Sequence, residues 1–441
     1  MNDLTLKGIN LLFFARSTIL KSIIVKIMKF RKMGSLDWDV SVLGFGAMRL
    51  PTKQIKDENT GEMKNVVEEN EAIKMIRHAI DNGVNYIDTA YPYHGGESEV
   101  VVGKALKDGY REKVHLTTKL PMWMVKKTED FDDFLNQQIE RLQTNPDIYL
   151  FHGLTKDRLE KIKSLNLIEK MEQAKAKGLI KHIGFSFHDK FEVFKEIIDF
   201  YNWDCCQIQY NYLDIGYQAG TKGLEYAGSK NIAVIVMEPI RGGKLVIPDN
   251  KLESKEEIKE VLDISKVKRS MADWALQFVW NHTEVSVVLS GMSTMQQVME
   301  NIDSASNSSV NSLTEDELNT ISNLRKAYDK YILVPCTSCG YCIPCPNDVA
   351  IPSVLRLLNE VAYWGESGRQ RITFFYNYMT KTQKDIEERR SKGEEIEGAA
   401  TLCIQCGECL DKCPQQIEIP DFMEKANEIF ENGKSISDIL L

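Results

Sequence analysis

The chain has 441 residues, 43% of them hydrophobic and 27% charged, which is typical of a globular protein with one large domain or two. Its formal net charge of -9 and the lack of a basic stripe argue against nucleic-acid binding. Eight of the ten cysteines follow residue 335 in two tight clusters, and only Cys205 and Cys206 lie elsewhere. This segregation indicates metal ligands in a reducing compartment, the cytoplasm, and not a disulfide framework.

We expect residues 1–27 to be an N-terminal extension outside the main fold. Segment 9–27 is rich in apolar residues but carries Arg16, Lys21 and Lys26, so it predicts no stable membrane span. It also lacks the uninterrupted apolar run and the small-residue cleavage site of a signal peptide. A helix lying on a membrane surface is the alternative interpretation.

From residue 28 to residue 312 the chain alternates short apolar strands with amphipathic helices, after a hairpin at 30–38. The expected strands are 42–46, 85–89, 114–119, 148–151, 182–186, 206–209, 233–237 and 285–290. Helical patterns follow them, for example at 71–82, 97–106, 135–142, 168–177 and 272–281. This alternation predicts an α/β fold, the (β/α)8 TIM barrel. A doubly wound open sheet is the alternative, but Gly44-Phe45-Gly46 lacks the third glycine of a dinucleotide fingerprint.

Polar side chains stand at the carboxyl ends of three consecutive expected strands. Asp88 ends the second strand and Tyr93 follows in its loop, Lys119 ends the third, and His152 ends the fourth. Each residue alone also has a structural interpretation, as a helix cap, a snorkelling lysine or a core histidine. A TIM barrel, however, carries its catalytic residues at these strand ends, so all four side chains are expected to meet there.

This order of residues, with Asp-Thr-Ala-x-x-Tyr at 88–93, resembles the catalytic tetrad of the aldo-keto reductases. The resemblance implies interconversion of an aldehyde or ketone and an alcohol with NAD(H) or NADP(H). Tyr93 would exchange the proton, and Lys119 would lower the pKa of that tyrosine. Asp88 would orient the lysine, and His152 would polarise the substrate oxygen.

The resemblance also implies positions for the nicotinamide cofactor. Ser186 and Gln207 would bind the nicotinamide amide, Met237 stands where many members stack an aromatic ring, and a turn at 241–243 would follow the pyrophosphate. A surface turn with no ligand is the alternative for that segment. The NADP-preferring members carry Lys and Arg where this chain has Gly291 and Gln297, so we predict a preference for NADH. Glu300 and Asn301 would contact the adenine. The full predicted set is Ser186, Gln207, Met237, Arg241, Gly242, Gly243, Gly291, Gln297, Glu300 and Asn301.

A connecting helix is expected at 313–331, and residues 332–441 carry two cysteine runs. The second run has three cysteines spaced by two residues and then a Cys-Pro pair, as in bacterial ferredoxins. Two such runs, each ending in Cys-Pro, predict two [4Fe–4S] clusters. Zinc is the alternative metal. Because the fourth cysteine of each ferredoxin run crosses over, one cluster is assigned to the first set and the other to the second set. These sets are Cys336, Cys339, Cys342 and Cys413, and Cys345, Cys403, Cys406 and Cys409.

Both cysteine runs continue through an Ile-Pro pair into a helix, at 351–360 and 419–428, and a charged segment at 381–397 is expected to be solvated. Together with the barrel, this C-terminal part resembles the branch of the aldo-keto reductases that carries an α-helical ferredoxin domain. Trp123 and a long loop at 244–265 are expected to shape the substrate pocket. The implied partners are a small carbonyl or alcohol substrate and a redox protein. The alternatives are an electron carrier or redox sensor with a non-catalytic barrel, or clusters with a structural role only.

Overall fold

The computed structural model describes residues 27–56, 63–253, 255–329, 333–334, 336, 342–380, 398–410, 413 and 417–440. Eight parallel strands form a closed barrel in which the first strand, β3, pairs with the last, β12. The predicted TIM barrel is therefore confirmed, with strand limits that differ from the expected ones by at most three residues. The strands are β3 (Leu43–Gly46), β6 (Tyr86–Asp88), β7 (His115–Leu120), β8 (Ile148–Leu154), β9 (His182–Phe187), β10 (Cys205–Gln209), β11 (Ala233–Met237) and β12 (Val285–Ser290).

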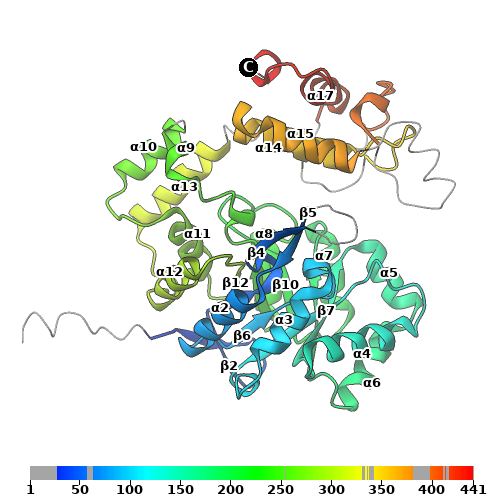
Figure 1. Cartoon of the computed structure of the whole chain (residues 1–441), viewed down its shortest axis with the longest axis vertical. Helices are drawn as coiled ribbons and strands as arrows, with labels where there is room; N and C mark the ends of the chain where they lie inside the picture. Colours follow the sequence, from blue (N-terminus) through cyan, green and yellow to red (C-terminus); the bar gives the residue numbers. More distant parts are fainter. Residues whose placement is uncertain are drawn as a thin grey trace, which may run out of the picture.

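Helices surround this barrel (Figure 1), and apolar side chains of these helices are buried in the core around it. In α2, for example, Ala72, Met75, Ile76 and Ala79 recur at helical spacing and are all buried. The helices between the strands include α2 (Glu69–Asp81), α3 (Glu97–Ala105), α4 (Asp130–Leu142), α5 (Lys156–Ser164), α6 (Leu167–Ala176), α7 (Phe191–Phe200), α8 (Gly220–Ser229) and α11 (Met271–Trp280), and α12 (Met295–Ser306) follows the last strand.

Alternate residues of the strands fill the inside of the barrel. Tyr86, Leu150, Cys205, Ile235 and Val287 form one buried cluster there. Side chains along a strand point to the same face at every second position. Two residues further toward the carboxyl ends, strands β6, β8 and β10 carry the polar residues Asp88, His152 and Gln207, which lie at the mouth of the barrel.

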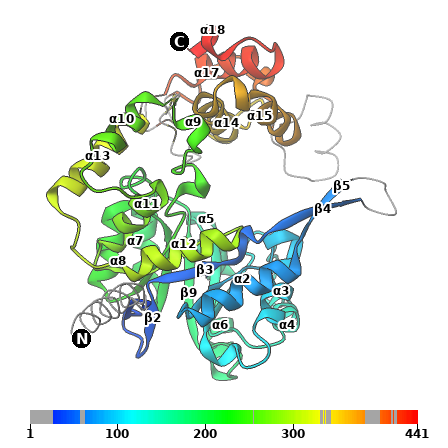
Figure 2. The ribbon, with the colours of Figure 1, turned by 60° about the vertical axis from the view of Figure 1, so that its left-hand side comes forward.

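Two hairpins accompany the barrel. The expected hairpin at 30–38 is formed by β1 (Phe30–Lys32) and β2 (Asp39–Ser41), so it extends three residues further. A second, unpredicted hairpin follows β3 and consists of β4 (Thr52–Lys56) and β5 (Met63–Val67). It projects from the barrel body in Figure 2.

The expectation of a long loop at 244–265 is wrong. This segment contains α9 (Asp249–Leu252) and α10 (Glu256–Ile264). Ile258 of α10 is buried in a cluster with Leu324 and Tyr328, which lie on α13 (Glu315–Asp329). The packing of α10 on a helix that comes much later in the chain explains why a local pattern does not reveal it.

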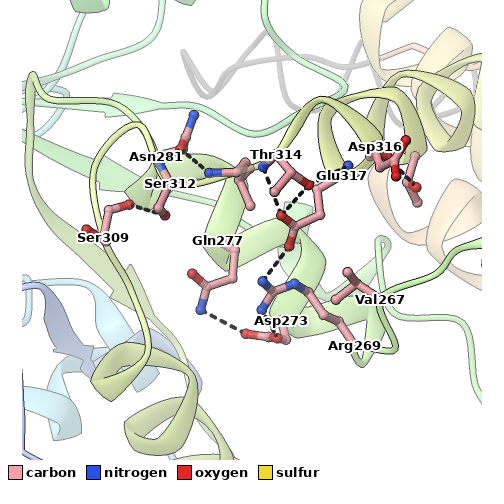
Figure 3. Close-up of polar contacts among 12 residues, drawn as sticks. Val267, Arg269, Asp273, Gln277, Asn281, Ser309, Ser312, Thr314, Asp316 and Glu317 are labelled. Carbon is pink, nitrogen blue, oxygen red and sulfur yellow. Dashed lines mark hydrogen bonds and ion pairs between the residues drawn. The ribbon is translucent and has the colours of Figure 1, made fainter.

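Helix α13 lies in the expected connecting segment, and a polar network fixes its first turn to the barrel (Figure 3). The Thr314 hydroxyl donates to Glu317, whose backbone N–H bonds back to Thr314, as in a capping box. Arg269 joins Glu317 at 2.7 Å and Asp273 of α11 at 3.0 Å. The start of α13 is thus anchored to α11 by charged and capping contacts.

Beyond α13 the chain builds a second, helical core, which Figure 1 shows as a separate layer above the barrel. Its buried residues include Val354, Leu358, Tyr376, Met423 and Phe430. The helices are α14 (Ile351–Trp364), α15 (Glu366–Met379), α17 (Ile419–Ala426) and α18 (Ile436–Leu440), with a short π-helical turn, η6 (Asn427–Glu431). No helix in the described part of the chain is both long and apolar enough to cross a bilayer. The expected extension (except Ile27), Cys339 and the charged segment 381–397 lie outside the described residues.

Candidate active site and cluster-binding region

Three neighbouring strands bring together the polar side chains expected at the barrel mouth. Asp88 is the last residue of β6, Lys119 lies near the end of β7, and His152 lies in β8. Tyr93 begins a short 3-10 turn, η2 (Tyr93–Gly96), that follows β6. The Nζ atom of Lys119 lies 2.6 Å from Asp88 Oδ1 and 3.3 Å from the Tyr93 hydroxyl oxygen. The ring of His152 stands edge-on to that of Tyr93, with centroids 6.0 Å apart.

Asp88 and Lys119 form a buried pair at ion-pair distance, in which burial raises the pKa of Asp88 and the Lys119 ammonium opposes that shift. Burial alone would lower the pKa of Lys119, but the Asp88 carboxylate and the Tyr93 phenol raise it above its usual value. Lys119 also donates to the backbone oxygen of Thr89 at 2.9 Å, and Gln207 donates to the second oxygen of Asp88 at 3.1 Å. Each charge therefore has the hydrogen-bond partners that a buried ion pair needs.

Lys119 lowers the pKa of Tyr93, as expected, but burial outweighs this effect. The net shift of the Tyr93 pKa is therefore upward. The phenol is protonated at neutral pH, which is the form that can donate a proton.

His152 has an unused polar atom. Burial lowers the pKa of its imidazole well below the usual value, and the positive charge of Lys119 adds to the effect. The ring is therefore neutral at neutral pH. Within the described residues, its buried Nδ1 atom has no hydrogen-bond partner. An unpaired buried atom of this kind is costly, and it suits a site that a ligand completes.

A buried carboxylate behind the tetrad supports Lys119 from its backbone side. Glu99 accepts hydrogen bonds from Thr118 and Gln138, each at 2.6 Å, and pairs with Arg141 at 3.2 Å. Gln138 also donates to the backbone oxygen of Lys119 at 3.1 Å. The sequence gives no signal for this network, because its members come from three separate elements.

The residues expected at the nicotinamide end lie beside the tetrad. The buried Ser186 hydroxyl accepts a hydrogen bond from the backbone of Gly153, next to His152, at 2.7 Å. Gln207 contacts Asp88 as described above. Met237 packs against the cluster inside the barrel. The structure thus brings Ser186, Gln207 and Met237 to the mouth that holds the four tetrad side chains.

The expected pyrophosphate turn is η4 (Arg241–Gly243), and its backbone is strained. Glu238 and Arg241 have φ values of 55° and 50°, although neither is a glycine. Such conformations cost about 1–3 kcal/mol each and persist only where surrounding contacts hold them. The guanidinium of Arg241 lies 3.6 Å from a carboxylate oxygen of Asp214.

The positions expected near the adenosine already have partners within the protein. The Gln297 side chain accepts from the backbone of Ser293 at 2.8 Å, at the start of α12. Asn301 is buried and donates to Ser290 at 2.9 Å, whereas the carboxylate of Glu300 accepts from Gln296 on the surface of the same helix. A contact of Gln297 or Asn301 with adenosine would therefore compete with these bonds.

One basic residue near this end was not predicted. A Cβ atom placed on Gly291 would lie 3.3 Å from Cβ of Arg49, and one placed on Gly242 would lie 2.9 Å from its Nη2 atom. Arg49 therefore spans the space between these two expected cofactor positions. Its guanidinium pairs with Glu238 at 3.0 Å. Its partners lie far from it in the sequence, so only the fold reveals this arrangement.

Trp123 lies at the rim of the site, as expected. Its ring is 45% exposed, and its centroid is 5.0 Å from that of His152. The guanidinium carbon of Arg158 lies 5.5 Å above the same tryptophan ring. The mouth therefore combines an exposed aromatic wall with a cation close to His152.

In the helical core, one predicted set of four cysteines lines a single cavity, the set Cys345, Cys403, Cys406 and Cys409. A [4Fe–4S] cluster takes four cysteine thiolates as ligands, and this set supplies four thiols around one space. Cys342 also lines the cavity, and Cys336 and Cys413 pack against the same core.

Comparison with known families agrees with this division of the chain. A family model described as "Aldo/keto reductase family" matches residues 42–326. A second model, "4Fe-4S dicluster domain", matches residues 335–418, which include all eight C-terminal cysteines.

Individual relatives match the barrel part. The "Uncharacterized oxidoreductase YqkF" of Bacillus subtilis (strain 168) is 26% identical over 325 residues, which cover 68% of this chain and 97% of that protein. The "L-galactose dehydrogenase" of Arabidopsis thaliana is 28% identical over 294 residues, with coverages of 62% and 87%. Among solved structures, the aldo-keto reductase AKR11C1 from Bacillus halodurans (holo form) superimposes with a TM-score of 0.54 at 28% identity, over 68% of this chain and 97% of that one.

Proposed function

Because this chain belongs to the aldo/keto reductase family and carries a C-terminal 4Fe-4S dicluster domain, we propose that it interconverts an aldehyde or ketone and the corresponding alcohol with a nicotinamide cofactor. We further propose that it exchanges electrons with a redox partner through two [4Fe–4S] clusters. Residues 28–312 would be the catalytic barrel, 313–331 the connecting helix and 332–441 the cluster domain. The observation that carries the proposal is the contact of Lys119 with both Asp88 and Tyr93 beside an unpartnered His152 atom.

A nicotinamide bound there would supply hydride to the carbonyl carbon in the reductive direction. The four side chains then handle charge and protons at the carbonyl oxygen. Neutral His152 would donate a hydrogen bond to that oxygen and stabilise the negative charge that develops on it. Tyr93 would give it a proton, because an alkoxide is far more basic than a phenol. Lys119, held by Asp88, would stabilise the phenolate that remains.

The cysteines would hold the clusters in the two predicted sets. Cys345, Cys403, Cys406 and Cys409 would bind one cluster, and all four line one cavity, which Cys342 of the other set also reaches. The remaining set, Cys336, Cys339, Cys342 and Cys413, would bind the other. When bound, such clusters supply one-electron transfer.

Replacing Tyr93 with phenylalanine tests the catalytic assignment. The change removes the hydroxyl with little loss of packing, so turnover should fall about 10²- to 10⁴-fold while cofactor affinity stays near normal. Tyr91→Phe is the matched control, because that hydroxyl only bonds Gln137 on the surface. The assay is an anaerobic screen of aldehydes, ketones and alcohols with NADH, NADPH and their oxidised forms. Near-full turnover by Tyr93→Phe would show that another group moves the proton.

We propose a preference for NADH over NADPH. Gly291 and Gln297 offer no charge to a 2′-phosphate, and two missing charge-assisted bonds are worth about 1.5–3 kcal/mol each. Arg49 is the nearby cation, and its pairing with Glu238 at 3.0 Å partly neutralises it. Parallel titrations of the anaerobic protein with both nucleotides test this, and clearly tighter NADPH binding would show that another cation binds the 2′-phosphate, with Arg49 as the candidate.

A further inference from the structure

Lys244 and Leu245 follow the strained turn η4. They contact side chains that belong neither to the barrel strands nor to the helices packed around them. Lys244 Nζ lies 3.0 Å from Glu360 Oε1, and the Tyr363 hydroxyl donates to the backbone oxygen of Lys244 at 2.6 Å. Glu360 and Tyr363 both lie on α14, the first helix of the iron–sulfur domain. The cluster-bearing domain therefore contacts the barrel next to the expected pyrophosphate turn.

Further contacts fix Tyr363 in this position. Its ring stacks on that of Tyr328, with centroids 6.5 Å apart and planes 6° apart. Tyr328 is itself buried, and its hydroxyl donates to the backbone oxygen of Leu245 at 3.2 Å. The Lys255 ammonium donates to the backbone oxygen of Tyr363 at 2.9 Å. Lys244 and Leu245 are thus both held by tyrosine hydroxyls that are in turn ordered by packing.

The ion pair between Lys244 and Glu360, next to the hydrogen bond from Tyr363, is also well defined. Oxygen Oε1 of Glu360 accepts from Lys244 at 3.0 Å and from Arg356, one turn earlier on α14, at 2.9 Å. The Glu360 side chain is only 17% exposed. Because Lys244 follows Gly243 directly, its position limits the conformations that Arg241, Gly242 and Gly243 can adopt.

We propose that Tyr363 and Glu360 are positioning residues for dinucleotide binding, because α14 of the iron–sulfur domain holds the Arg241–Gly243 turn in the shape that accepts the diphosphate. This inference rests on the proposed function, since it takes that turn as the diphosphate site. Thermodynamic linkage then requires the reverse effect: a bound dinucleotide stabilises the docking of α14 on the barrel by the same factor. The two domains are thereby coupled through one loop.

The first test is a titration of full-length, anaerobically purified protein with NADH. Tyr363→Phe and Glu360→Gln should each raise the dissociation constant about 3- to 10-fold, the range for one hydrogen bond. The turnover number at saturating NADH and the iron content should stay unchanged, because neither side chain touches the tetrad or the cysteines in the contacts described. Tyr226→Phe is the control, since its hydroxyl bonds the exposed Asp199 and its loss should leave NADH binding within about twofold.

Hydrogen exchange supplies a readout that does not depend on turnover. Peptides covering residues 240–246 should exchange faster in Tyr363→Phe than in the parent protein. NADH should slow exchange at the contact between α14 and the barrel in the parent and do so less in the variant.

Unchanged NADH affinity and unchanged exchange in both variants would overturn the inference while leaving the proposed function intact. A parent protein that binds neither NADH nor NADPH would instead refute the proposed function, and this inference with it. Loss of iron from either variant would also contradict the inference, because it would assign these side chains to cluster binding.

Discussion

Replacing Asp88 with asparagine should destabilise the barrel by about 3–5 kcal/mol at neutral pH, as breaking a buried ion pair does. The Lys119 side chain is fully buried and that of Asp88 is 4% exposed, and the charged atoms are 2.6 Å apart. At an effective dielectric constant of about 20, unit charges at this distance attract by about 6 kcal/mol. Asparagine preserves the volume and one hydrogen-bond acceptor, so part of this energy is retained. The remaining cost is that of a buried ammonium without a counter-charge.

The pH dependence of the variant follows from the same pair. In the parent, Asp88 raises the folded pKa of Lys119, so this contribution to stability is complete below the unfolded lysine pKa and is lost as the pH rises through the folded one. Without Asp88, burial places the folded pKa of Lys119 below the unfolded value of about 10.4. At pH values between the folded and the unfolded pKa of Lys119, the unfolded state then binds more protons than the folded state. The stability of Asp88→Asn should therefore increase as the pH is raised toward about 10.

Urea unfolding under anaerobic conditions measures both effects. Five of the six tryptophans lie in the barrel, so tryptophan fluorescence reports mainly on that core. Asp316→Asn is the control, because it removes an exposed pair with Lys266 and should not change the midpoint measurably. Equal stability of parent and Asp88→Asn at neutral pH would refute the reasoning, since it would mean that the pair contributes no net charge interaction to the folded state.

Three further outcomes are expected. Burial lowers the pKa of His115, which stacks on Trp38, to about 4. The free energy of unfolding should therefore fall by about 2–3 kcal/mol as the pH drops from about 6.5 to about 4. His115→Phe should remove this dependence in an acid titration. Cys406→Ser should lower the iron content from about eight to about four atoms per chain in an anaerobic iron assay, and an unchanged content would contradict the ligand assignment. Arg49→Gln should weaken NADH binding about 10-fold, whereas an unchanged dissociation constant would show that Arg49 does not reach the dinucleotide.

Local sequence patterns were sufficient to predict the barrel. Strands such as Ala233–Met237 are buried on both faces and appear as short apolar runs, and each is followed by a helix with an apolar stripe. Segments without such a pattern were missed. The hairpin β4–β5 carries polar residues, for example Lys53 and Gln54, and α10 is held by packing against α13, which a local pattern cannot reveal.

The candidate site also contains residues that the sequence predicts and residues that only the fold reveals. Asp88, Lys119 and His152 could be predicted because each stands at the end of a recognisable strand. Arg49 and Glu99 could not, since their partners Glu238 and Arg141 are brought to them only by the closed barrel. The direction of the Tyr93 pKa shift also depended on burial, which the sequence does not give.

Closure of the barrel through β3 and β12 has a consequence for the order of folding. Leu43 pairs with Val288, so the first strand lacks one of its two neighbours until nearly the whole barrel has been synthesised. Contacts between such distant parts of a chain slow folding, and an unpaired strand edge invites aggregation in the meantime. Because synthesis runs from the N-terminus, the ring can close before the cysteine runs at 336–345 and 403–413 are made. Cluster insertion would then take place beside a barrel that is already complete.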